Sequence, residues 1–138
     1  MSMAKTILLV DDDTGFRSTV ASVLERAGVD VAEVPDGIAA LEYLTRNFPT
    51  LPDLIVSDLN MPLMDGGTLC RRVREISAYN AVPFVILSAT VETTGADLTN
   101  IPADLCLSKQ SPLADILAQL QDRSEEHTSE LQSRQYLV

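Results

Sequence analysis

Several polar residues of this sequence stand directly at the ends of apolar runs. Asp11 and Asp12 follow the first run, Asp58 follows another, Ser88 ends the next, and Lys109 follows the last. Neighbouring carboxylates in a cleft repel one another and lose hydration, so a cation must offset the free-energy cost of placing them there. Carboxylates, a hydroxyl and an ammonium suit one hard divalent cation, such as Mg²⁺, together with a phosphoryl group. The residue types therefore predict a cation and phosphoryl site, provided that the fold brings them together.

Five apolar runs alternate with segments of helical periodicity, a pattern typical of parallel strands joined by right-handed crossovers. Three runs are apolar throughout, as central parallel strands are, whereas the second and fifth alternate and suit the edges of a sheet. We therefore predict an α/β, flavodoxin-like, doubly wound sheet of strand order 2-1-3-4-5 with helices on both faces. The predicted strands are Thr6–Val10, Val29–Val34, Leu54–Ser57, Phe84–Ser88 and Asp104–Ser108.

Apolar residues at helical spacing predict the helices between and after these strands. The residues expected on their apolar faces are Phe16, Val20, Val23, Leu24 and Ala27; Ile38, Leu41, Leu44 and Phe48; Leu69, Val73 and Ile76; and Leu113, Ile116, Leu117 and Leu120. The segment Val91–Ile101 is a poor helix because Thr93, Thr94 and Gly95 have low helix propensity, and we expect it to be short or mobile. Asp13 or Thr14 is expected to cap the first helix, and Gly28 to end it.

In an open parallel sheet, ligands bind beyond the carboxyl ends of the strands, near the point where the strand order reverses. All of the polar residues named first belong to that edge, so the topology predicts that they converge. Simpler interpretations exist for each of them. Asp12 can cap a helix, Asp58 and Ser88 can form turns, and Lys109 can be a solvated surface charge.

Composition limits the class of protein. The chain has 138 residues, 46% of them hydrophobic, which suits one compact domain. A net charge of -10 disfavours direct binding of nucleic acid, which requires many Lys and Arg side chains. Since no apolar run approaches the length of a membrane span and no secretory leader is recognisable, we expect a cytoplasmic protein with no membrane contact. The spacing of Cys70 and Cys106 suggests neither a disulfide nor a metal site.

The last residues, 123–138, differ from the rest of the chain, lack helical periodicity and contain the only histidine, His127. Read back through the codon table, this string can be a translated short-read sequencing adapter. We therefore predict a domain over residues 1–122 and a non-native tail over 123–138, the alternative being a disordered linker. On this interpretation, an output domain can follow Asp122 in the natural gene.

Four motifs, in order and spacing, resemble the receiver domain of two-component response regulators such as the chemotaxis regulator: "LLVDDD", "DLIVSDLNMPLMDGG", "FVILSA" and "LSK". The resemblance covers roughly Lys5 to Gln121. It implies that Asp58 is the phosphoacceptor and that Ser88 and Lys109 contact the phosphoryl group. It also implies that Mg²⁺ or Mn²⁺ is held by Asp11, Asp12, Asp58 and the backbone carbonyl of Asn60. The donor would be a phosphohistidine on a sensor histidine kinase or a histidine phosphotransfer protein, and the face from Val91 to Gln121 would report the change.

The sequence departs from the family's pattern at two positions. Cys106 stands where the family usually carries a Tyr or Phe that switches its rotamer, and Gln110 replaces the proline that usually follows the lysine. These departures predict an atypical readout surface. Asn60 and Thr90 occupy the positions that tune the lifetime of the phosphoryl group in the family.

Two other functions remain open at this stage. One is a pseudo-receiver, an interaction module that keeps the fold without phosphorylation, which Cys106 and Gln110 motivate. The other is a phosphatase of the haloacid dehalogenase type, in which Asp11 would be the nucleophile and Asp13 the acid. The main hypothesis is a self-phosphorylating switch with autophosphatase activity rather than a conventional turnover enzyme.

Overall fold

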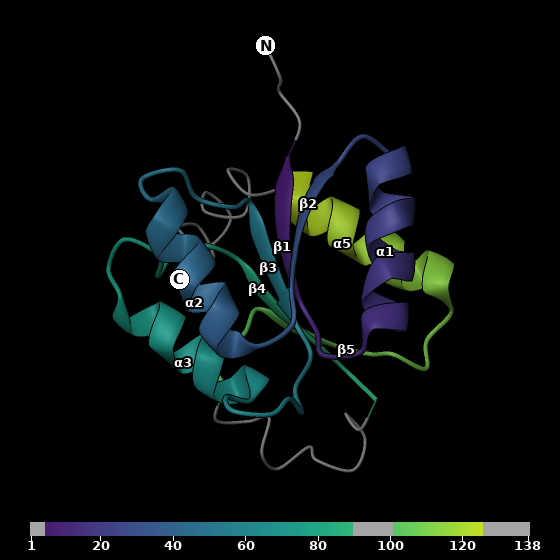
Figure 1. Ribbon diagram of the computed structural model, residues 1–138. Coiled ribbons are helices and arrows are strands. Elements are labelled where there is room, and N and C mark those ends of the chain that lie inside the picture. Colours follow the sequence, from purple (N-terminus) through teal and green to yellow (C-terminus); the bar gives the residue numbers. More distant parts are fainter. Residues whose placement is uncertain (1–4, 90–100, 126–138) are drawn as a thin grey trace, which may run out of the picture.

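A five-stranded parallel sheet forms the centre of the molecule, with helices on both faces (Figure 1). The computed structural model describes residues 5–89 and 101–125. The strand order is β2-β1-β3-β4-β5, and all neighbouring strands pair in parallel, which confirms the predicted topology. The strands are β1 (Thr6–Val10), β2 (Asp30–Val34), β3 (Leu54–Ser57), β4 (Phe84–Ser88) and β5 (Leu105–Ser108).

The described helices lie on both sides of the sheet (Figure 1). Helices α2 (Gly37–Asn47) and α3 (Gly66–Glu75) cover one face, and α1 (Thr14–Arg26) and α5 (Leu113–Glu125) cover the other. Of the segment predicted as a poor helix, residues 91–100 lie outside the described residues. No helix in the described ranges is long and apolar enough to cross a membrane. Helix α5 continues past Asp122 to Glu125, and the origin of the tail stays a prediction.

Strand β1 shows how the sheet builds two cores. Ile7 and Leu9 face the core formed with α1 and α5, whereas Leu8 and Val10 face the core formed with α2 and α3. All four side chains are buried, because a central strand is covered on both faces. The edge strands β2 and β5 are only partly buried, as their alternating sequences predict.

Aspartates begin three of the helices. The side chains of Asp13, Asp36 and Asp65 each accept a hydrogen bond from the amide three residues later, at 3.1, 2.8 and 2.7 Å. Such caps satisfy amides that have no partner within the helix and contribute about 1 kcal/mol each. Asp13, rather than Thr14, is therefore the cap of α1. At the other end of α1, Gly28 has a φ of +93°, a left-handed conformation that glycine adopts readily.

The predicted apolar faces are wrong at several helix positions. Ile38 and Phe48 at the two ends of α2 are 42% and 50% exposed, although they share helical spacing with the buried Leu44. Helix α2 instead packs through the small residues Gly37 and Ala40. Small side chains let the helix approach closely, and the larger apolar residues at its margins are then left outside the contact. Ala27, Ile76 and Leu113 are likewise exposed.

Arg74, near the end of α3, links segments that are distant in sequence. Its guanidinium donates to the carbonyl oxygens of Asn80, Val82 and Pro102 and forms a 2.9 Å ion pair with Asp104. The same carboxylate accepts the amide of the first residue of β4 at 2.8 Å. This network fixes the loop before β4 and the entry to β5, and so the register of the two strands that carry Ser88 and Lys109.

We predict that Arg74→Met destabilises the fold by about 2 kcal/mol, because it removes the guanidinium that pairs with a mostly buried carboxylate and donates to three carbonyls. Arg71→Met on the same helix is the matched control. Arg71 is exposed, so its change in unfolding free energy should stay within about 0.5 kcal/mol. Urea unfolding of the two variants beside the parent chain measures both values. Equal stability of the two variants would contradict a structural role for the Arg74 network.

Candidate functional site

The carboxyl ends of the central strands place the candidate residues at one edge of the sheet. The amide of Asp58 donates to the carbonyl of Val10 at 2.9 Å, and the amide of Lys109 donates to the carbonyl of Ser88 at 3.0 Å. The backbone ladders thus extend one residue beyond each strand. The side chains of Asp58 and Lys109 therefore project from the same edge although they are far apart in sequence.

Three carboxylates gather at this edge. Asp11, Asp12 and Asp58 each offer an oxygen, and these oxygens lie within 4.8 Å of one another. Asp11 and Asp58 are 2% and 9% exposed, whereas Asp12 is exposed. The predicted convergence of the three aspartates is therefore present, and two of them are removed from water.

The ammonium of Lys109 lies between the two buried carboxylates. Its Nζ is 2.8 Å from Asp11 Oδ2 and 3.6 Å from Asp58 Oδ2. The same Nζ lies 4.6 Å from the centre of the Phe16 ring, within range of a cation–π interaction. Lys109 thus supplies positive charge to the cluster, and an aromatic face from α1 borders it.

Burial raises the pKa of Asp58 to about 6 from an ordinary value of 3.8. The charge of Lys109 and the hydrogen bond from the Leu59 amide, at 2.8 Å, oppose this shift in pKa, whereas the neighbouring Asp11 charge adds to it. Desolvation is the largest of these effects, since the carboxylate loses water that its partners replace only in part. Asp58 is still mostly ionised at neutral pH, and bringing a further cation nearby would favour that form.

The donor set fits a magnesium ion. Two oxygens bound to one Mg²⁺ at about 2.1 Å lie at most about 4.2 Å apart, so the cluster needs only a small contraction to share an ion. Carboxylates are hard ligands, and Asp12 stands at the exposed side, where waters can complete an octahedral shell. A bound ion would compete with Lys109 for Asp11 Oδ2.

Backbone contacts hold two of the carboxylates in place. Arg17 donates to the carbonyl of Asp11 and forms a 3.0 Å ion pair with Glu33 on β2. A Cβ atom on Gly66 would collide with the carbonyl of Asp58, so the first residue of α3 must be glycine for the loop to close here. Neither contact was predicted from the sequence. The contact between Gly66 and Asp58 had one possible signal in the sequence, which is a glycine after "MD" a few residues beyond an aspartate at a strand end.

The remaining predicted residues are placed as follows. Ser88 is fully buried at the end of β4, opposite Ser108 of β5. Asn60 is exposed, and Thr90 lies outside the described residues. Cys106, at the position of the family's aromatic switch, is half-buried and packs against the core on the α2 and α3 side. Gln110 is exposed, and its backbone N–H donates to Ser108 Oγ at 3.0 Å.

Comparison with known proteins agrees with this geometry. The model of the response regulator receiver domain matches residues 7–121, and the chain belongs to this family. The transcriptional regulatory protein PrrA of Mycobacterium tuberculosis is 36% identical over 116 residues, which are 83% of this chain and 47% of PrrA. CseB of Streptomyces avermitilis is 38% identical over 87 residues, or 63% of this chain and 34% of CseB. The chain thus spans less than half the length of these two relatives.

Solved structures share the fold. The chemotaxis response regulator CheY4 of Vibrio cholerae superposes with a TM-score of 0.77 at 30% identity, covering 88% of this chain and 98% of that one. The receiver domain of an HD domain-containing protein from Pseudomonas fluorescens gives a TM-score of 0.81 at 24% identity, covering 96% and 95%. The chain is therefore a receiver domain of the two-component response regulator family, whose members are phosphoacceptor switches.

The raised pKa of Asp58 predicts a stability cost at neutral pH. The folded state holds this proton more tightly than the unfolded state, so the cost is absent below about pH 4, grows up to about pH 6 and is complete above it. Without divalent cations, we expect Asp58→Asn to raise the unfolding free energy by roughly 1 to 3 kcal/mol at pH 8 and by much less at pH 3.5. Urea unfolding at both pH values, with EDTA present, measures the difference.

Asp30→Asn is the control for this prediction, because Asp30 is exposed at the start of β2. Its substitution should change stability by less than about 0.5 kcal/mol at either pH. A gain for Asp58→Asn that is the same at both pH values would rule out ionisation of Asp58 as its cause.

Proposed function

We propose that Asp58 is the phosphoacceptor of this receiver domain and that it takes a phosphoryl group from a phosphohistidine on a sensor histidine kinase or a histidine phosphotransfer protein. The observation that carries this proposal is the position of Asp58. It is a largely buried carboxylate at the carboxyl end of a central strand, with two more carboxylates and an ammonium around it.

The proposed step is a direct displacement at phosphorus. A carboxylate oxygen of Asp58 forms the new O–P bond, the P–N bond of the phosphohistidine breaks, and the electron pair leaves with the imidazole nitrogen. The ionised form of Asp58 is the nucleophile, so a pKa of about 6 leaves it active at neutral pH. Charge on the transferring group would be met by Lys109, whose Nζ is already 3.6 Å from Asp58 Oδ2.

A divalent cation, Mg²⁺ or Mn²⁺, is the proposed cofactor, held by Asp11, Asp12, Asp58 and the backbone carbonyl of Asn60. When bound, it neutralises charge on the phosphoryl oxygens and orients them. The chain's own contribution is to hold the carboxylates at fixed positions. Arg17 and the close contact of Gly66 with the Asp58 backbone support this role.

Phosphorylation adds about -1.5 to -2 charges at this edge, and Ser88 and Lys109 are proposed to move toward the new group. Such a movement would favour one of two pre-existing states of the face from residue 91 to Gln121. Relatives with this domain include transcriptional regulators, so the output of the natural protein is proposed to lie in a further domain or a partner protein. With a charge of -10, this domain itself is not proposed to bind DNA.

The test is to incubate the chain with acetyl phosphate or phosphoramidate, with and without Mg²⁺, and to weigh the intact protein. We expect a labile adduct of one phosphoryl group that requires Mg²⁺ and is lost in Asp58→Asn. Asp30→Asn, an exposed aspartate outside the site, should form the adduct as the parent chain does.

The other outcomes assign other functions. An adduct on Asp11 would favour the phosphatase of the haloacid dehalogenase type. If Mg²⁺ binds but neither donor yields an adduct, the pseudo-receiver that Cys106 and Gln110 suggest becomes the better interpretation.

The ring of Phe16 gives a second prediction. Its contact with Lys109 Nζ, at 4.6 Å, should be worth about 0.5 to 1 kcal/mol in holding the ammonium beside Asp58. Phe16→Leu keeps an apolar side chain but removes the aromatic face, so we expect the adduct to form about two to five times more slowly with Mg²⁺ saturating. Phe16→Tyr, which retains the ring, should restore the parent rate. Equal rates of adduct formation for Phe16→Leu and Phe16→Tyr would show that the ring does not position Lys109.

A further inference from the structure

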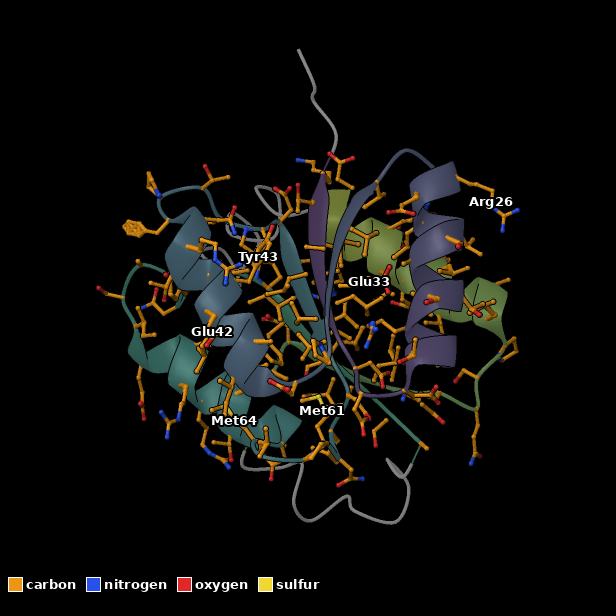
Figure 2. The ribbon with its side chains drawn as sticks, in the orientation of Figure 1. Arg26, Glu33, Glu42, Tyr43, Met61 and Met64 are labelled. Atoms are coloured by element: carbon orange, nitrogen blue, oxygen red, sulfur yellow. The ribbon has the colours of Figure 1, made fainter. Side chains whose placement is uncertain are left out.

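A groove of about 780 Å³ lies on the side of the sheet opposite α1 and α5. Most of its lining comes from α2, and the loop between β3 and α3 and one residue of α3 supply the rest. Figure 2 shows Glu42 on α2 and Met64 beside α3 on this side of the molecule. The groove is lined by Ile38, Leu41, Glu42, Thr45, Arg46, Leu63, Met64 and Arg72. None of the residues proposed to take part in phosphoryl transfer lines it.

Leu63, which lines the groove, is unfavourable for stability in two ways: its apolar side chain is exposed and its backbone is strained. Its side chain is 80% exposed, the largest exposed fraction among the large hydrophobic residues in the described ranges. Its φ is +73°, a left-handed conformation that asparagine and glycine adopt more readily than leucine. Either asparagine or glycine would relieve the backbone strain and remove apolar surface from water. A leucine that does neither is explained if its side chain is buried by a partner.

The loop that carries Leu63 is held against α2. Met64 packs against the first residue of that helix so closely that a Cβ atom on Gly37 would lie 2.9 Å from its sulfur atom. Leu63 is therefore presented by a fixed support beside Ile38, which is itself 42% exposed. Two apolar side chains at the rim of a preformed groove are typical anchors for an amphipathic helix.

The charges of the groove differ from those of the chain. The whole chain has a net charge of -10, yet the groove is lined by two arginines, Arg46 and Arg72, and one glutamate, Glu42. Both arginines are exposed. A partner with carboxylates beside its apolar residues would be attracted here, whereas an anionic membrane surface would be repelled by the chain as a whole.

We propose that the groove between α2 and α3 is a docking site for an acidic amphipathic helix of a partner protein. The apolar side chains of that helix cover Leu63 and Ile38, and its carboxylates pair with Arg46 and Arg72. This interaction lies outside the face from residue 91 to Gln121 and does not require phosphorylation of Asp58. The receiver domain thereby gains a second protein contact that its phosphoacceptor chemistry does not explain.

The probe is a phage-displayed library of helical peptides with apolar residues at i, i+3, i+4 and i+7 and all other positions randomised, selected on the full chain. We expect the selected peptides to be enriched in Asp and Glu and to bind with a Kd on the order of 10 µM. In amide NMR spectra they should shift the resonances of α2, α3 and the loop that contains Leu63.

Three variants test the site itself. Leu63→Asn should weaken binding of the selected peptides about tenfold while the melting temperature stays the same or rises, because asparagine tolerates the left-handed backbone. Replacing Arg46 and Arg72 together by Glu should weaken binding to a similar degree. The matched control is Arg26→Glu at the end of α1, far from the groove (Figure 2), and it should leave the Kd within about twofold.

The proposal is overturned if the selected peptides bind Leu63→Asn as tightly as the parent chain, or if their shifts map to another face. It is also overturned if selection on the parent chain enriches no peptide over selection on Leu63→Asn. Binding of the parent chain, but not of Leu63→Asn, to phosphatidylcholine and phosphatidylglycerol vesicles without peptide binding would assign the surface to lipid instead. Since the peptides are assayed without a phosphoryl donor, these outcomes are independent of adduct formation on Asp58.

Discussion

One ammonium between two buried carboxylates is the interaction on which the candidate site depends. Asp11 and Asp58 repel each other and lose water at the end of the sheet, and Lys109 compensates part of that cost from 2.8 and 3.6 Å. The compensation is incomplete, which is why the pKa of Asp58 is raised to about 6. A carboxyl edge with unmet negative charge has a physical reason to bind a further cation and, through it, a phosphoryl group.

Much of the surrounding architecture keeps this arrangement in register. Parallel pairing places the carboxyl ends of the strands at the same edge of the sheet. Arg17 contacts the backbone of Asp11, and Gly66 lies against the backbone of Asp58. Farther from the site, Arg74 pairs with Asp104 just before β5, and the same carboxylate accepts the amide of the first residue of β4. The site is therefore a property of the whole sheet, and substitutions remote from the carboxylates can disturb it by shifting a strand.

The loop between β3 and α3 contributes both to the candidate site and to the groove between α2 and α3. The segment after Asp58 returns to α3 through Gly66, and on the way it places Leu63 in solvent with a strained backbone. Stability alone favours a different residue there. The loop thus serves two requirements, a tight closure beneath the phosphoacceptor candidate and an exposed apolar contact on the neighbouring face.

The sequence by itself determined the strand order, the edge and central positions of the strands, and the edge at which Asp11, Asp58 and Lys109 meet. These follow from local periodicity and from the parallel connection of strands, both of which are written in residue spacing. Only the tertiary structure decided how the side chains share that edge. Burial of two aspartates but not Asp12, the choice of Asp11 as the closer partner of Lys109, and the exposure of Ile38 and Leu63 depend on how closely helices and loops approach the sheet. Spacing along the chain does not specify that approach, because desolvation and packing are set by neighbours from distant segments.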